Sequence, residues 1–340
     1  MSLRVLIAGG YGMIGSHAAR HLRRINKEVE IIIAGRNPEK GKALAEELGN
    51  ASVALLDIIN VDSSLDAVGD IDLIVAALQD PADKLIHAAI ARDIAHIGIT
   101  KLIGDISPIT FAAIQTPLSK PVLLLGHTDA GINMYVAQKA SEDFSSIQSI
   151  QLASLYDPND PIGPMNASEF DDNGGMSEQA LIRKDGNWEW VKVSDNIRQI
   201  HIDGVSLDGV PYQLLDVPSL AGTTRAPNIR VDILQGESIG TKAGQTPSHD
   251  VYIEIEGILK TGEEVVRKVV VSNPNGQAHE TGLGIAIAID GVLNLVGKPN
   301  SGGIYLPETL VNTDDAIHRI EESGVRIEKN DFIKLKTEFI

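Results

Sequence analysis

Cysteine is absent from the 340 residues. Disulfides, thiolate metal sites, cysteine-ligated iron–sulfur clusters and a cysteine nucleophile are therefore excluded. Long apolar runs are also missing: the longest with helical length, Thr281–Gly297, is interrupted by Asp290 and falls short of the ~20 residues of a membrane span. The chain opens on Met-Ser-Leu-Arg and continues into an apolar strand pattern with no secretory signal. We therefore expect a soluble, cytoplasmic protein.

Basic residues are scarce relative to acidic ones, with 29 Lys and Arg against 46 Asp and Glu and a formal net charge of −17. Such a surface repels phosphate backbones and anionic lipids, so we expect neither nucleic acid nor a membrane as partner. A small-molecule substrate is the expected partner. Aromatic residues make up only 4% of the chain, but hydrophobic residues make up 43%, enough to fill a sizeable core.

The first part of the chain alternates short apolar runs with amphipathic stretches of helical spacing. Because several of these runs are apolar at every position, they indicate strands buried on both faces of a parallel sheet. The expected fold class is α/β, with a Rossmann-type doubly wound parallel sheet. The expected strands are Leu3–Ala8, Glu30–Ala34, Val53–Leu56, Leu73–Ala77, Ile94–Ile99 and Pro121–Leu125, and the expected helices between them include Met13–Arg24, Pro38–Leu48, Ala82–Ala91 and Gly131–Phe144.

Beyond residue 147 the sequence becomes β-branched and turn-rich, which predicts a second, mixed β-rich α+β domain. We expect a loop or lid at Asn159–Gly186 and helices at Ala278–Val296 and Thr313–Ser323. The predicted domains are an NADP-binding Rossmann domain at 1–146, a substrate and dimerisation domain at 147–277, and a C-terminal segment, 278–340, that folds back onto the Rossmann domain. The expected strands of the second domain are Ile147–Tyr156, Gln199–Asp203, Ile229–Leu234, Val251–Leu259 and Glu264–Val271, the last two joined by a hairpin turn at Lys260-Thr261-Gly262.

The second domain also suggests self-association. Its strands include edges that need covering, and Trp188 and Trp190 alternate so that both side chains share one strand face. We interpret the two tryptophans as core or interface residues, with a ligand platform as the alternative. The expected assembly is a homodimer.

A glycine-rich motif follows the first strand and opens the first helix. It satisfies G-x-G-x-x-G, in which the glycines allow a tight turn, close approach of the backbone to a pyrophosphate, and close packing of helix on strand. Amides at the helix N-terminus would then bind the phosphates. The predicted cofactor-binding residues of this loop are Gly9, Gly10, Tyr11, Gly12, Met13, Ile14 and Gly15.

The residues after the second strand indicate which dinucleotide binds. Where an NAD-binding protein carries an acid for the ribose, this chain carries Arg36 and Asn37. A guanidinium suits a 2′-phosphate, so NADP(H) is the predicted cofactor; the alternative is a solvated arginine with NAD bound through the backbone. We also expect Asp57 to reach the adenine and Ala76 and Ala77 to lie beside the nicotinamide ribose, with ordinary strand-end residues as the alternative.

Three stretches together resemble the saccharopine dehydrogenase family, in particular its glutamate-forming saccharopine reductase branch. They are the N-terminal loop with Ala34-Gly35-Arg36-Asn37, the segment Asp129-Ala130-Gly131-Ile132-Asn133, and the C-terminal stretches Thr281-Gly282, Gly302–Glu308 and Gly324–Ile327. The resemblance implies a Rossmann domain with an inserted substrate domain, and hydride transfer to or from an imine or secondary amine. The chain departs from the family pattern at Ala130, which replaces a proline, at Asn133, which replaces an acid, and after Thr100.

The resemblance implies a functional aspartate at position 129, so Asp129 is the predicted catalytic acid. The alternative is that Asp129 is a helix N-cap. His127 lies in the same loop and is the predicted proton donor, with a structural loop histidine as the alternative. Arg225 is predicted to bind a substrate carboxylate, with a solvated arginine as the alternative. Asn133 is the second predicted substrate-binding residue.

Two further motifs carry weaker predictions. Tyr135 and Lys139 have the Tyr-x-x-x-Lys spacing of short-chain dehydrogenases but follow one strand too late, so we expect a plain surface pair. His17 and His21 have H-x-x-x-H spacing but no third ligand that the sequence can name, so we expect packed or solvated histidines and no metal site.

The expected function is an NADP(H)-dependent oxidoreductase acting on a C–N bond of an amino-acid-derived substrate. Two alternatives stay open at this point: a non-enzymatic NADP(H)-binding sensor or regulator, and an unrelated reductase of aldehydes or lactones.

Overall fold

The computed structural model describes residues 2–100, 102–161 and 178–333. These residues pack into two compact units, which are described separately. The first comprises the described residues of 2–131 and 278–312, and the second those of 132–161, 178–277 and 313–333. None of the described helices combines the length and apolar character needed to span a lipid bilayer.

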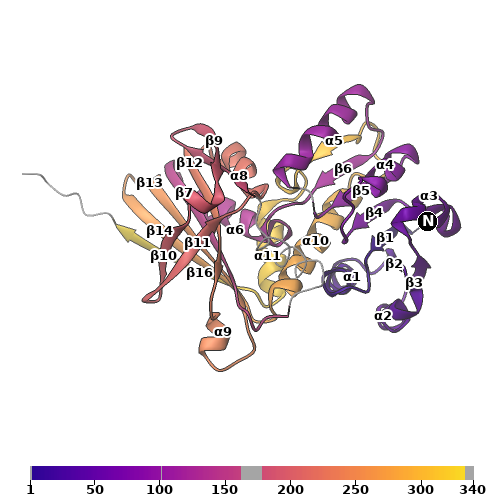
Figure 1. Cartoon of the computed structure of the whole chain (residues 1–340), viewed down its shortest axis with the longest axis horizontal. Helices are drawn as coiled ribbons and strands as arrows, with labels where there is room; N and C mark the ends of the chain where they lie inside the picture. Colours follow the sequence, from indigo (N-terminus) through magenta and orange to yellow (C-terminus); the bar gives the residue numbers. More distant parts are fainter. Residues whose placement is uncertain (1, 101, 162–177, 334–340) are drawn as a thin grey trace, which may run out of the picture. The chain divides into compact units, whose positions relative to one another are not determined.

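The first unit contains, within its described residues, a parallel sheet of seven strands in the order β15-β6-β5-β4-β1-β2-β3 (Figure 1). This order, with β1 between β2 and β4, is that of a doubly wound sheet, as predicted. The strands are β1 (Arg4–Ala8), β2 (Glu30–Gly35), β3 (Ala51–Leu55), β4 (Leu73–Ala76), β5 (Ala95–Gly98), β6 (Pro121–Leu124) and β15 (Gly303–Tyr305).

Helices cover both faces of this sheet, which explains why its strands are apolar at consecutive positions. Side chains of one face of β1, such as Val5 and Ile7, pack against α1 (Met13–Ile25), α2 (Lys42–Leu48) and α10 (Gln277–Leu293). Leu6 and Ala8, on the other face, pack against α3 (Val61–Val68) and α4 (Lys84–Ala91). Helix α5 (Ile103–Gln115) precedes β6.

The second unit is built on a mixed sheet. Within the described residues this sheet has nine strands, and its main path is β10-β11-β12-β7-β13-β14-β16. Strands β7 and β12 are parallel and the other pairs are antiparallel. Helix α6 (Ile132–Ser141) packs on β7, β13 and β14, and on α8 (Asp216–Thr224) and α11 (Thr313–Glu322). The strands are β7 (Phe144–Tyr156), β8 (Gln179–Lys184), β9 (Asn187–Lys192), β10 (Arg198–Ile202), β11 (Val205–Pro211), β12 (Asn228–Gln235), β13 (His249–Leu259), β14 (Glu264–Asn273) and β16 (Arg326–Ile333), and a short helix α9 (Ile239–Lys242) lies between β12 and β13.

The predicted hairpin is present: β13 and β14 run antiparallel on either side of the turn that contains Gly262. The predicted loop at Asn159–Gly186 is wrong in its last part, because Gln179–Lys184 form β8, which pairs with β9 and β12. This strand has only three consecutive apolar residues, Ala180–Ile182, between polar ends, which is a weak signal for a strand. The central part of that loop, 162–177, lies outside the described residues.

The two compact units divide the chain at residues that differ from the expected boundaries. Helix α6 groups with the second unit although it precedes residue 147, and β16 pairs with β14 of the second sheet although it follows residue 278. In contrast, α10 and β15 group with the first unit. Packing alone does not show which segments fold independently, so the domain boundaries stay a prediction.

Candidate functional site

The glycine loop between β1 and α1 is shaped by contacts that exclude side chains. Gly9 has φ +79°, and a Cβ there would lie 2.5 Å from the carbonyl oxygen of Ala77. A Cβ on Gly15 would lie 2.3 Å from the carbonyl oxygen of Gly9, and one on Gly10 would lie 2.8 Å from that of Ile7. Backbone alone fits this turn, as a loop that approaches a pyrophosphate requires.

The start of α1 suits an anion. The helix begins at Met13 with Gly12 as N-cap, and no side chain caps it and no acidic residue lies in its first turn. The N–H of Gly12 donates to the carbonyl oxygen of Gly9 (2.9 Å), which closes the turn. The positive end of the helix dipole is therefore not offset by a local carboxylate, and the amides that follow Gly12 can bind phosphate.

Tyr11 ties the glycine loop to the residues after β2. Its hydroxyl accepts a hydrogen bond from the backbone N–H of Asn37 (2.9 Å). Its ring lies against Gly35, where a Cβ would be 2.6 Å from the phenol oxygen. The contact fixes the backbone on both sides of Arg36, whose side chain is exposed, as is Asn37. A glycine at 35 and a tyrosine at 11 together hold the segment that the sequence assigns to cofactor selection.

Asp57 has a local role in the structure. One carboxylate oxygen accepts from the N–H of Ile59 (3.0 Å) and the other from the side-chain amide of Asn60 (3.0 Å), so the residue caps the 3₁₀ turn Ile58–Asn60. These contacts support the strand-end alternative, and the predicted contact with adenine stays untested. Ala76 is the last residue of β4. The N–H of Ala77 donates to the carbonyl oxygen of Ala8 (3.0 Å), and the carbonyl group of Ala77 lies against Gly9.

His127 and Asp129 lie in the loop after β6, and both side chains are buried. The 3₁₀ turn Thr128–Gly131 contains two consecutive non-glycine residues with left-handed backbone, Asp129 (φ 47°) and Ala130 (φ 52°). Such strain is costly for a residue with a Cβ and is concentrated at functional sites. Asp129 lies inside this turn, three residues before α6 begins, and not at the N-cap position of that helix.

The strained turn is held by the first turns of α10. The hydroxyl of Thr281 donates to the carboxylate of Asp129 (3.3 Å). A Cβ on Gly284 would lie 2.5 Å from the carbonyl oxygen of Asp129 and 2.7 Å from that of Ala130, so the glycine permits the close approach. The Thr281-Gly282 motif that the sequence singled out therefore belongs to the segment that contacts Asp129.

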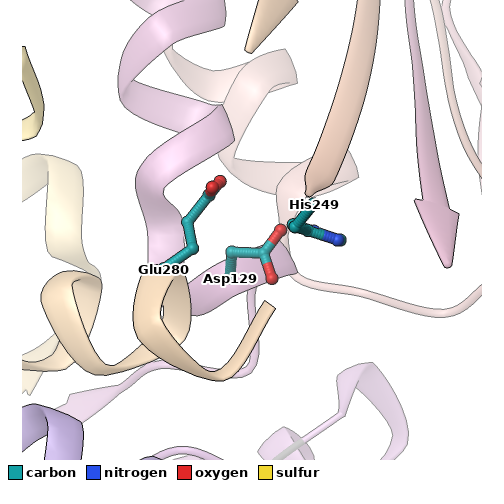
Figure 2. A group of neighbouring side chains, drawn as sticks. All are labelled: Asp129, His249 and Glu280. Carbon is teal, nitrogen blue, oxygen red and sulfur yellow. The ribbon is translucent and has the colours of Figure 1, made fainter. Parts of the chain in front are cut away.

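Glu280 is a residue that the sequence did not identify. It is fully buried on α10, and a carboxylate oxygen lies within 4.8 Å of one of Asp129 (Figure 2). The signal available was a single acid near the start of a helix that is otherwise largely apolar. Within the first unit the structure thus places two carboxylates together beside a strained turn. Figure 2 also draws His249, which belongs to the second unit and is described with it.

Burial determines the charge of His127. Its removal from water lowers the pKa of the imidazole to about 3, so the ring is neutral at pH 7. A neutral imidazole carries one N–H and one lone pair, so it can relay a proton but does not hold an extra one.

The two predicted substrate-binding residues, both in the second unit, differ in their exposure to solvent. Arg225 is exposed at the C-terminal end of α8, where its backbone is left-handed (φ 60°), whereas Asn133 is fully buried in α6. Their predicted contacts with substrate stay untested. Tyr135 is fully buried and Lys139 pairs with Glu142 and Asp314, which fits neither a proton-transfer pair nor a pair wholly on the surface.

His249 starts β13 and is buried within the second unit. Its Nε2 lies 3.5 Å from the hydroxyl oxygen of Ser154, and its ring meets that of Tyr156 edge-on, with centroids 5.5 Å apart. Trp188 and Trp190 share a face of β9, as predicted, but both are 49% exposed and neither is a core residue.

The fold is similar to that of a solved structure, the L-Glu-forming saccharopine dehydrogenase of Saccharomyces cerevisiae, with a TM-score of 0.67 over 97% of this chain and 100% of that chain at 14% identity. This chain has the saccharopine dehydrogenase fold. Two structures solved with NAD bound share the architecture at lower similarity. Homospermidine synthase from Legionella pneumophila matches with a TM-score of 0.59 (10% identity, 99% and 93% of the two chains), and an oxidoreductase from Agrobacterium radiobacter, solved with NAD⁺, L-tartaric acid and magnesium, matches with 0.50 (14% identity, 96% and 98%).

Residues 1–107 also match the model of the shikimate/quinate 5-dehydrogenase family. No curated protein matches the sequence significantly. The comparisons confirm the predicted resemblance at the level of the saccharopine dehydrogenase fold, and they confirm the predicted Rossmann-like sheet with a second mixed β domain. The fold is shared with the two proteins above that were solved with NAD bound.

Proposed function

We propose that this protein is an NADP(H)-dependent oxidoreductase that transfers hydride to or from the C–N bond of an imine or secondary amine derived from an amino acid. The observation that carries the proposal is the glycine loop of the first unit. Three of its glycines meet backbone where a Cβ would be, and the loop leads into an uncapped helix start. This cradle fits a dinucleotide pyrophosphate, and the saccharopine dehydrogenase fold supports the reaction class.

The preference for NADP(H) rests on the segment after β2. An exposed arginine stands where an acid would hydrogen-bond the ribose of NAD, and Tyr11 fixes the backbone beside it. A guanidinium can bind a 2′-phosphate bidentately, whereas it offers no matching acceptor to two ribose hydroxyls.

The proposed chemistry uses Asp129. A bound nicotinamide supplies or accepts the hydride at the carbon of the C–N bond. Hydride addition to the carbon of an iminium neutralises the positive charge on its nitrogen, and hydride removal from the amine creates that charge. A buried carboxylate would stabilise the charged iminium form electrostatically. The hydroxyl of Thr281 orients the Asp129 carboxylate, and the neutral imidazole of His127 in the same loop can relay the proton that the amine gains or loses.

The experiment is steady-state oxidation of NADPH by the purified chain with mixtures of amino acids and oxo acids or semialdehydes, comparing the native chain with Asp129→Asn. Asparagine is nearly isosteric but uncharged. We expect turnover to fall by ~10²-fold or more while NADPH affinity and Tm stay nearly unchanged, the scale of a lost acid–base group.

Two outcomes would contradict the proposal. If the native chain binds NADPH but oxidises it with no such mixture, the alternative of a non-enzymatic NADP(H) sensor is favoured. If turnover occurs and survives Asp129→Asn, the enzyme assignment stands and Asp129 is a structural residue of the turn.

We also propose that the protein is a homodimer that associates through the second unit. Large apolar side chains are exposed there, among them Trp188 and Trp190 on β9, Ile258 on β13 and Phe332 on β16 (55% exposed). Covering them would remove apolar area from water. Sedimentation equilibrium should give twice the 36.4 kDa chain mass, and Trp188→Ser with Phe332→Ser should shift the equilibrium toward monomer. A native chain that remains at the monomer mass at micromolar concentration contradicts this.

A further inference from the structure

Three histidines meet in the first unit where α1 packs against α10. His17 and His21 are four residues apart on one face of α1. His279 lies in the first turn of α10, and its ring centroid is 5.5 Å from that of His17 and 4.5 Å from that of His21. Both contacts are edge-on, with interplanar angles of 74°. The structure thus supplies the third histidine that the sequence could not name.

A glycine explains why the two helices come so close. A Cβ on Gly282 would lie 2.5 Å from the Cβ of His17 and 2.8 Å from the backbone nitrogen of Ala18. Any side chain at 282 would push α10 away from α1. Because His279 lies one turn before Gly282, the same contact brings its ring over the α1 pair.

The main chain fixes the orientation of His21. Its ring hydrogen-bonds the backbone of His279, in the sense that favours an N–H on the ring. The other ring nitrogen then carries a lone pair, and metal-binding histidines commonly show this arrangement.

We propose that His17, His21 and His279 form a binding site for a divalent transition-metal ion of the Zn²⁺ class. Imidazole nitrogens suit Zn²⁺, Ni²⁺ and Cu²⁺ and not Mg²⁺ or Ca²⁺, which prefer oxygen ligands. With Zn–N bonds of ~2.0–2.1 Å, two imidazoles on one tetrahedral ion have centroids about 5 Å apart. The observed centroid distances of 4.5 and 5.5 Å bracket that value. A water molecule completes the coordination.

Two features of the surroundings set the strength of the site. The ring nitrogens do not all lie within 4.8 Å of one another, so binding requires rotation about χ2, a soft torsion for histidine. Arg24 acts on His21 and His279 as a positive charge and opposes a cation, whereas Arg20, the charge that acts on His17, is neutralised by Glu47 (2.7 Å). None of the three histidines belongs to the proposed cofactor or catalytic residues, so the site is independent of the proposed function.

The test is a Zn²⁺ titration of the chelator-stripped full chain by calorimetry, with Co²⁺ absorption spectra of the same sample. We expect one saturable site and a Co²⁺ spectrum typical of tetrahedral nitrogen ligation. His17→Ala and His279→Ala should each weaken Zn²⁺ binding by at least about tenfold. Arg24→Gln should tighten it, and His87→Ala, which removes an exposed histidine on α4, should leave it unchanged.

Absence of saturable Zn²⁺ binding by the native chain overturns the proposal. Binding that survives both His17→Ala and His279→Ala also overturns it, because the ion then lies elsewhere. If either variant fails to fold, as judged by circular dichroism, the Co²⁺ spectrum of the native chain still decides, and octahedral oxygen-type bands contradict the site. NADPH affinity should be the same in all variants that fold.

Discussion

The side chain of Arg36 is exposed one residue after β2 ends, and the backbone next to it is held by the hydroxyl of Tyr11. Because the backbone beside it is already held, an anion that binds this guanidinium has to order only the arginine side chain. On the proposed function, this one residue would distinguish between two cofactors that differ by a single phosphate.

We expect Arg36→Ala to weaken NADPH binding by about 10- to 150-fold and to leave NADH binding nearly unchanged. The magnitude follows from the ~1.5–3 kcal/mol of a charge-assisted hydrogen bond. Fluorescence titration of both cofactors measures it. Equal losses for NADPH and NADH would mean that the arginine does not contact the 2′-phosphate.

Asp129 and Ala130 matter at this scale because of their strained backbone conformation. Asp129 and Ala130 occupy left-handed backbone that their side chains disfavour, and contacts from α10 offset the cost. The contact of Thr281 with Asp129 joins residues 152 positions apart in the chain. The strained turn therefore depends on α10 being docked.

At the scale of elements, the junction of β1 and α1 depends on glycine at each close approach. A Cβ at Gly15 would lie 2.3 Å from the oxygen of Gly9 and 2.9 Å from the Cα of Gly10, and both atoms are backbone that cannot rotate away. The helix can enter its first turn this close to the strand only because position 15 has no side chain.

We expect Gly15→Ala to reduce the affinity for NADPH and NADH together, by about tenfold or more, because the whole pyrophosphate loop must shift. This pattern differs from that of Arg36→Ala. Gly104→Ala is the matched control: Gly104 lies in α5 with no atom within 4 Å of the added methyl group, so cofactor binding should not change. Helix propensity predicts a gain of ~0.5–1 kcal/mol in its free energy of unfolding. Retained binding in Gly15→Ala would contradict the assignment of the loop.

At the scale of the whole molecule, buried histidines link stability to pH. The pKa of His127 is lowered from 6.5 to about 3 by burial, so the folded chain keeps the ring neutral. Below pH 6.5 the unfolded chain takes up a proton that the folded chain does not, and the free energy of unfolding therefore falls as the pH decreases from 6.5 toward 3. The contribution is up to about 1.4 kcal/mol per pH unit.

Urea unfolding at pH 7, 6 and 5, with a chelator present, measures this dependence. His127→Gln should reduce the slope, since glutamine does not titrate, but should not abolish it, because burial also lowers the pKa of His21 and of His279. His87→Gln at an exposed position of α4 should leave the slope as in the native chain. An unchanged slope in His127→Gln would show that the histidine is protonated to the same extent in both states.

The amino-acid sequence by itself determined the class of fold, six of the seven described strands of the first sheet and the glycine loop; the short strand β15 was not predicted. These features are local: periods of apolar residues define strands and helices, and glycines mark the turns that admit no side chain. The same reasoning failed at β8, where a short strand with polar ends is locally indistinguishable from a loop.

Only the tertiary structure decided which distant residues meet. The carboxylate of Glu280 beside Asp129, the contact of Tyr11 with Asn37 and the approach of His279 to His17 and His21 each join segments that the chain order separates. No local pattern encodes these distances. Those of Glu280 and His279 depend on how α10, from the far end of the chain, packs against α1 and the turn after β6, and the contact of Tyr11 depends on how β1 pairs with β2. Asp129 was visible in the sequence as a candidate and Glu280 was not, and packing made the two carboxylates neighbours.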